Sequence, residues 1–205
     1  IALFAIGERA IASLTESREP RRLLDEVWSR GVGATTACLE QGLWNFAIRA
    51  VQIDATASVD PAFGYENAFD KPTDFIRLVQ ISANEYFSDP LTRYEFEAQY
   101  IYADVDPIYV RLVSNDASYG GDLSLWPDSF TLWMGHWLAV QIAPAMKNDL
   151  DMEKLEKRER RLLVEARSRD ASQEPPRFSP YNSWVRARHG GKMTRDRGSR
   201  SQLIG

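Results

Sequence analysis

The chain has very few of the residues on which nucleophilic or metal-assisted catalysis usually depends. Its 205 residues include one cysteine, Cys38, and two histidines, His136 and His189. A single cysteine excludes an internal disulfide framework and a multi-cysteine metal site. The motifs of serine hydrolases, P-loop enzymes, dinucleotide-binding proteins and zinc proteases are also absent. We therefore expect a protein that is not an enzyme and needs no cofactor or metal.

Long apolar runs are missing as well. No stretch approaches the roughly 18 residues that a membrane-spanning helix requires. Hydrophobic residues make up 44% of the chain and the mean hydropathy is -0.38, so we expect a globular domain that does not bind membranes. Within it, His136 is predicted to be a hydrogen-bonded core histidine and Cys38 a small buried hydrophobic residue.

The net charge of -4 conceals a division between the body of the chain and its end. Residues 174–205 carry 7 basic and 2 acidic residues, a balance of +5, which leaves 18 basic and 27 acidic residues upstream, a balance of -9. The same end contains Pro175-Pro176 and Gly190-Gly191 and has no helical periodicity. These features predict an acidic domain over residues 1–172 and an extended basic tail over residues 173–205.

Six residues of this tail form a candidate binding segment. They are three aromatic residues, Phe178, Tyr181 and Trp184, and three basic residues, Arg177, Arg186 and Arg188. Large aromatic side chains are costly to leave in water, so a partner or the chain's own domain should cover them. We interpret the aromatics as anchors and the charges as groups that steer the tail to an acidic protein surface.

Apolar residues at helical spacing predict four helices. They cover residues 1–6, 17–41, 125–146 and 149–171. Gly31 and Gly33 interrupt the second helix, so that helix is weak there or another backbone packs closely against it. The third is apolar on nearly all sides, which predicts burial, and Pro144 should kink or end it. The last is highly charged and has only a thin apolar stripe.

Alternating apolar and polar residues predict a β-insertion over about residues 44–115. The candidate strands are residues 44–53, 75–81, 94–102 and 108–113. Asp104–Pro107 is predicted to be a turn that joins the last two strands as a hairpin. The expected fold class is therefore α+β and mainly α: a helical bundle with an inserted small antiparallel β-sheet and an extended C-terminal tail.

The order of several short motifs resembles the head-to-tail adaptor (connector) family of tailed bacteriophages, whose short-tailed members are called tail tubular protein A. The motifs are Ile6-Gly7-Glu8, Ser13-Leu14, Gly42-Leu43-Trp44-Asn45-Phe46, Pro72-Thr73-Asp74-Phe75, the Tyr94–Tyr109 segment and Leu125-Trp126-Pro127-Asp128-Ser129-Phe130. The resemblance ends near Ala171, and Asn45 and Phe46 stand in a different order from the family pattern.

This resemblance implies a structural virion protein at the head–tail junction, made in the cytoplasm of the bacterial host. It implies a homo-oligomeric ring, a dodecamer, that docks on the portal protein and meets a downstream tail or stopper protein. Genomic DNA would pass through its channel without sequence-specific binding, and the C-terminal extension would clasp the portal. In this interpretation the β-insertion faces neighbouring subunits through aromatic residues: Tyr94, Phe96, Tyr100, Tyr102 and Tyr109.

Two other functions are compatible with the sequence. A carboxylate pair drawn from Glu95, Glu97, Asp104 and Asp106 would make the chain a virion-associated hydrolase of cell-wall or polysaccharide glycans. Residues 95 and 97 point to the same face of a strand, roughly 7 Å apart. Alternatively, the basic and aromatic residues of the tail would grip nucleic acid. The acidic body favours a protein partner, because tight phosphate contacts would hold DNA that must move.

Overall fold

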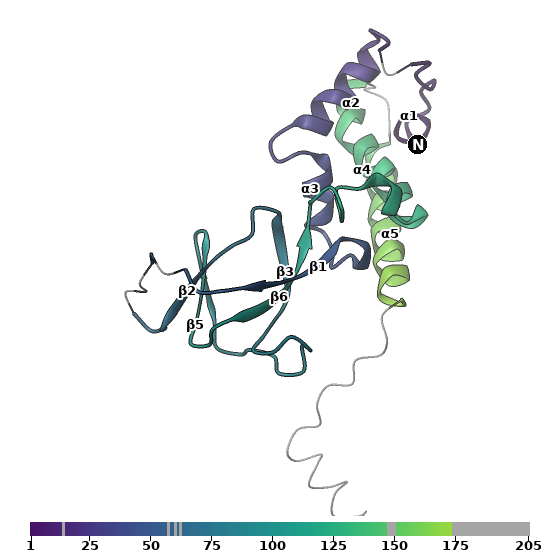
Figure 1. Ribbon diagram of the computed structural model, residues 1–205. Helices are drawn as coiled ribbons and strands as arrows, with labels where there is room; N and C mark the ends of the chain where they lie inside the picture. The colour runs from purple at the N-terminus through teal and green to yellow at the C-terminus, as the bar shows by residue number, and fades with distance from the viewer. Residues whose placement is uncertain (14, 57, 60, 62, 147–150, 174–205) are drawn as a thin grey trace, which may run out of the picture. The chain divides into compact units, whose positions relative to one another are not determined.

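The computed structural model describes residues 1–173, apart from positions 14, 57, 60, 62 and 147–150. This part of the chain is an α+β structure, as expected (Figure 1). Its helices are α1 (Ala2–Ala5), α2 (Glu19–Ser29), α3 (Ala34–Leu39), α4 (Asp128–Met146) and α5 (Met152–Ala171). Its strands are β1 (Ile48–Ile53), β2 (Asn67–Asp70), β3 (Phe75–Ser82), β4 (Glu95–Glu97), β5 (Tyr100–Ala103) and β6 (Ile108–Ser114).

The first helix ends where the Ile6-Gly7-Glu8 motif begins. Gly7 has φ 73, and its amide donates to the carbonyl of Phe4 at 3.1 Å. The amide of Glu8 donates to the carbonyl of Leu3 at 2.8 Å. This pair of bonds is a Schellman C-cap, in which glycine adopts the left-handed conformation without steric cost. The predicted stop at Gly7 is confirmed.

The single helix expected over residues 17–41 is wrong. The chain instead forms α2 and α3, separated at residues 30–33. Gly31 and Gly33 have φ 61 and φ 84, values that a helix does not contain. No atom lies within 4 Å of the position that a Cβ on Gly31 would take, so close packing does not explain this glycine. The glycines serve the turn between two short helices.

The apolar helix α4 is the centre of the helical region, as its composition predicted. It contacts α1, α2 and α5 (Figure 1). Phe130, Trp133, Ala139 and Ile142 are buried on different sides of it. Pro144 lies inside the helix, close to its end at Met146. The charged α5 packs through a narrow stripe in which Leu155 and Ala166 are buried and two leucines are half-buried, Leu162 and Leu163.

Two three-stranded antiparallel sheets form the β-region, which we define as residues 48–114. Sheet A has the order β1-β6-β3 and sheet B the order β2-β5-β4. The predicted hairpin between residues 94–102 and 108–113 is therefore wrong, because β5 and β6 belong to different sheets. Strand β2, which was not among the candidate strands, pairs with β5 from Asn67↔Ala103 to Asp70↔Tyr100.

A turn inside the run 94–102 explains the difference. Ala98 has φ 44 and reverses the chain, so that Glu97 on β4 pairs with Tyr100 on β5. The run is therefore itself a hairpin of two short strands. Alternation of side chains continues through both arms of such a hairpin, and it does not distinguish the hairpin from one long strand.

Two hydrophobic clusters organise the β-region and its junction with the helices. The buried members of one cluster are aliphatic apart from Phe69, and this cluster lies between the sheets with Ile101, Val110 and Leu112 fully buried. The other joins Val113 of β6 to Trp44, Phe130 and Trp133. Because Val113 belongs to β6 and Phe130 and Trp133 belong to α4, this cluster packs the end of β6 against the helical region.

Candidate functional site

The aromatic residues predicted to form a subunit interface fall into two groups. Tyr94 and Phe96 pack against the β-region core, and their rings meet edge to face with centroids 5.7 Å apart. Phe96 also lies 5.8 Å from the ring of Phe75, and the Lys71 ammonium lies 4.9 Å from its centroid. These two aromatics therefore contribute to the chain's own packing.

Tyr100 and Tyr102 lie on the other face of sheet B. Their neighbours Ile101 and Ala103 are fully buried, so the alternation of β5 turns the tyrosines away from the core. The rings of Tyr100 and Tyr102 are 6.3 Å apart, and Tyr65 stacks 6.4 Å from Tyr102. The Arg93 guanidinium lies 5.4 Å from the Tyr65 centroid. The result is a half-buried row of tyrosines, which we call the tyrosine face.

Carboxylates flank the tyrosine face. Glu95 pairs directly with Tyr102 and Glu97 with Tyr100, and directly paired residues share a face of the sheet. Both glutamates are exposed. On the other side of β5, Asp70 pairs with Tyr100 and accepts a hydrogen bond from the Thr56 hydroxyl at 2.9 Å. The two candidate catalytic glutamates thus stand beside the tyrosines on an open surface.

The other two candidate carboxylates hold local structure. Asp104 forms an ion pair with Arg93 at 2.9 Å and accepts from the amide of Glu66 at 3.2 Å. Asp106 accepts from the amide of Ala55 at 2.9 Å. These bonds fix the loops that surround β5, which is a structural role for both aspartates.

Tyr109 lies on sheet A, where it is half-buried beside Arg111 on the face opposite the core. The Arg111 guanidinium lies 4.1 Å from the centroid of Phe87, and the side-chain amide of Gln80 donates to the Phe87 carbonyl at 3.1 Å. The turn after β3, which contains Phe87, also contains Tyr86, and Tyr86 is 80% exposed. The sequence analysis missed this turn, although Asn84 and Ser88 are residue types that favour turns.

The six residues predicted to bind the portal lie outside the described residues. They are Arg177, Phe178, Tyr181, Trp184, Arg186 and Arg188. The last described element before them is α5, and Gln173 is the last described position. Their role stays a prediction from the sequence.

His136 and Cys38 have the structural roles that the sequence predicted. His136 is 6% exposed, and its Nδ1 lies 3.0 Å from the carbonyl of Leu132. Because a carbonyl only accepts, Nδ1 donates in this bond. Cys38 is fully buried, and burial, with a smaller contribution from Glu159, raises the pKa of its thiol to about 12. A thiol in this state is not a nucleophile at neutral pH.

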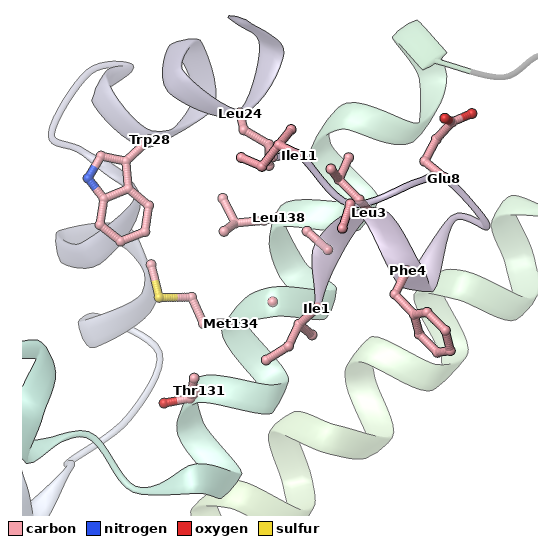
Figure 2. A pocket seen from close by; sticks show the side chains of 13 residues that line it. Ile1, Leu3, Phe4, Glu8, Ile11, Leu24, Trp28, Thr131, Met134 and Leu138 are labelled. Carbon is pink, nitrogen blue, oxygen red and sulfur yellow. The ribbon is translucent and has the colours of Figure 1, made fainter. Parts of the chain in front are cut away.

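An apolar cavity that the sequence did not predict lies where α1, α2 and α4 meet. Its volume is about 410 Å³. Trp28 and Ile1 lie on opposite sides of it, with Met134 and Leu138 of α4 between them (Figure 2). Other apolar lining residues include Leu3, Phe4, Leu24 and Ile11, and Glu8 and Thr131 are the polar lining residues. It is a hydrophobic hollow without the convergent polar groups that mark a catalytic pocket.

Within the described residues, no three or more His, Cys, Asp or Glu side chains are grouped so as to hold a metal ion. No helix in that same part of the chain is long and apolar enough to cross a membrane. The chain matches no known protein-family model and no curated protein. The fold and the side chains therefore define an α+β protein whose most distinctive described surface is the tyrosine face.

Proposed function

We propose that this chain is a structural virion protein, a head-to-tail adaptor of a tailed bacteriophage. The observation that carries the proposal is the order of elements. Helices precede and follow a β-region that occupies residues 48–114, which is the fold that the motif resemblance implies. The Ile6-Gly7-Glu8 motif stops a helix, and Trp44 lies at the junction with the β-region, so two of the resembling motifs have defined structural roles.

In the proposed assembly the chain forms a dodecameric ring on the portal protein. Residues 174–205 clasp the portal, with the tail aromatics as anchors. The tyrosine face and Tyr109 contact a neighbouring subunit or the downstream tail protein. Tyrosine suits this role because one side chain supplies apolar area and a hydrogen-bonding group. The acidic body lets genomic DNA pass without binding it tightly.

The deciding experiment measures mass by light scattering, for the purified chain alone and mixed with the portal protein of the same genome. We expect a stable ring complex in the mixture. A chain ending at Gln173 should remain folded and fail to join the portal. A truncated chain that binds as well as the full chain would refute the role assigned to the tail, and a full chain that never binds would refute the adaptor function.

The interface role of the tyrosine face is tested separately. Tyr100→Ser with Tyr102→Ser should leave portal binding by the tail intact and prevent ring closure. The matched control is Tyr86→Ser, which removes a tyrosine that is 80% exposed in the turn that follows β3. Complete rings from the double variant would rule out an interface at this face.

The second candidate is the virion-associated glycan hydrolase, which uses a carboxylate pair. One observation favours it: Glu95 and Glu97 are exposed two residues apart on one face of β4, and glycoside cleavage uses a pair of carboxylates. Release of reducing sugar from cell-wall glycan, lost in Glu95→Gln and Glu97→Gln, would establish this function. No release by the full chain would exclude it for that substrate.

A further inference from the structure

The last turn of α5 is bonded to the start of the β-region. Both carboxylate oxygens of Asp170 accept from the amide of Asn45, at 3.1 and 3.0 Å. The side-chain amide of Asn45 donates to the carbonyl of Asp170 at 2.8 Å. Two residues that are 125 positions apart in sequence thus hold each other reciprocally. Asp170 is only 7% exposed, so these bonds are largely shielded from water.

The bonds fall at a structurally critical point. Asn45 opens the 3-10 turn η1 (Asn45–Ala47), which leads directly into β1. The residue before it, Trp44, gives this turn no side-chain cap. A carboxylate that accepts from the first amide of a turn supplies what a capping side chain would supply. Asp170 therefore caps, from a distant helix, the turn that begins the β-region.

A second residue on the last turns of α5, Arg167, contacts the chain on the other side of Trp44. The guanidinium of Arg167 donates to the carbonyl of Gln41. The indole of Trp44 between these points is fully buried and donates to the carbonyl of Cys38 at 3.3 Å. The end of α5 thus holds the chain before and after a buried tryptophan, at the base of β1.

We propose that this contact, the α5 clamp, is a positioning device. We define it by Asp170, Arg167, Asn45 and the Gln41 carbonyl. It holds β1 in a fixed orientation to α5. Residues 174–205 follow α5 in the sequence. The clamp therefore connects the end of α5, where the tail begins, to the start of the β-region. This consequence rests on the proposed adaptor function, in which the tail is fixed to the portal and the β-region meets its neighbour. The orientation itself is a property of the free chain.

The orientation is measured by electron paramagnetic resonance between spin labels at Lys157→Cys on α5 and Glu97→Cys on β4, both exposed positions. Cys38 is fully buried and stays unlabelled. We expect a narrow distance distribution in the labelled parent and a clearly broader one after Asp170→Ala. Arg169→Ala is the matched control, since it removes only an exposed ion pair with Glu165 on the same turn, and it should stay narrow.

Removal of a buried carboxylate also risks unfolding, so two gentler variants accompany the first. Asn45→Ala and Arg167→Ala each remove part of the clamp and leave Asp170 with an amide partner. Broadening in either variant, with an unfolding midpoint near that of the parent, supports the clamp. Distributions as narrow as the parent in both would overturn it.

A mixture with the portal protein separates the clamp from the proposed function. We expect Arg167→Ala to bind the portal through its tail and to lose complete rings. If the parent itself does not bind the portal, the adaptor function fails while the distance measurement still decides the clamp. If Arg167→Ala broadens the distances and still completes its rings, the clamp positions the β-region but assembly does not require it, which overturns the link to the tail.

Discussion

The junction with the helical region and the outer face of the β-region use their aromatic residues differently. Trp44, Phe130 and Trp133 pack together at the junction, with Trp44 4.9 Å from Phe130 and 5.7 Å from Trp133 between ring centroids. The β-region has a mainly aliphatic core, and two of its tyrosines, Tyr100 and Tyr102, lie half-buried on an outer face. The junction therefore buries its aromatic rings together, whereas the β-region packs some of them, such as Phe96, and places Tyr100 and Tyr102 on an outer face.

The polar interactions differ as well. Ion pairs on α5 join neighbouring turns and are exposed, as in Arg160 with Glu156. In the β-region, Asp74 links two strands, because it accepts from Arg49 of β1 at 2.8 Å and from the Ser114 hydroxyl of β6. Its side chain is 11% exposed. These ion pairs on α5 are solvated, whereas Asp74 links β1 to β6 from a largely buried position.

Trp44→Ala should have the largest effect, because it removes the ring on which both regions meet. We expect a loss of about 3–5 kcal/mol in the free energy of unfolding, from lost burial and the cavity that remains. Chemical denaturation followed by circular dichroism measures it. Trp28→Ala is the control, a tryptophan that is 41% exposed, and its loss should be much smaller. Equal losses would contradict the central role of the junction.

The sequence was sufficient for the elements that have strong local signals. The apolar composition of α4 predicted its central position, and Gly7 predicted the end of α1. The α+β class followed from the change between helical and alternating periodicity, but the single inserted sheet that was expected is wrong, because the strands form two sheets. His136 was correctly assigned to the interior from its place in an apolar helix, and Cys38 from the absence of a nearby histidine in the sequence.

What the sequence did not reveal depends on pairing between distant residues. Alternation through the turn at Ala98 concealed a hairpin, and the four-residue strand β2 is too short to give a periodic signal. The same limit applies to the candidate sites. The tyrosine face exists because β4, β5 and Tyr65 come together, and the α5 clamp joins Asn45 to Asp170 across most of the chain. Neither arrangement leaves a local pattern.

Asp74→Asn should cost about 1.5–3 kcal/mol at neutral pH, the usual value of hydrogen bonds to a charged group. Burial raises the pKa of Asp74, but hydrogen bonds from Ser114 and Arg49 outweigh burial, and the net pKa is lowered. A lowered folded pKa gives stability that is complete above the unfolded pKa of about 3.9 and lost as pH falls through the folded pKa. The free energy of unfolding of the parent should therefore approach that of the variant as the pH falls into the acid range.

Glu156→Gln supplies the comparison for this prediction. It removes the exposed pair with Arg160 on α5 and should cost no more than about 0.5 kcal/mol. Unfolding in urea at pH 7 and at pH 3 measures both variants. A pH-independent cost of Asp74→Asn would show that the carboxylate charge is not what stabilises the sheets.

Gly31→Ala and Gly64→Ala compare backbone strain in the two regions. Both glycines have positive φ, 61 and 82, and neither has an atom within 4 Å of an added Cβ. Each substitution should cost about 1 kcal/mol, because an L-residue is strained in the left-handed conformation. Similar shifts in the denaturation midpoint would show that each turn is rigid. No shift for one of them would mean that its loop relaxes into another conformation.

Labelling of Cys38 has the smallest expected effect, since the folded chain should not react at all. The thiol is fully buried and its pKa is raised to about 12, so almost no thiolate exists or is accessible at pH 8. A thiol reagent should therefore modify Cys38 only through unfolding of the helical region, and the rate of modification should rise with denaturant concentration.

In Trp44→Ala the rate of Cys38 modification should increase strongly, because this variant removes the buried indole that donates a hydrogen bond to the Cys38 carbonyl at 3.3 Å. In Asp74→Asn it should increase only as far as the sheets share the same unfolding transition. Equal acceleration in both variants would show that the two regions unfold as one unit, and acceleration in Trp44→Ala alone would show that the helical region opens separately.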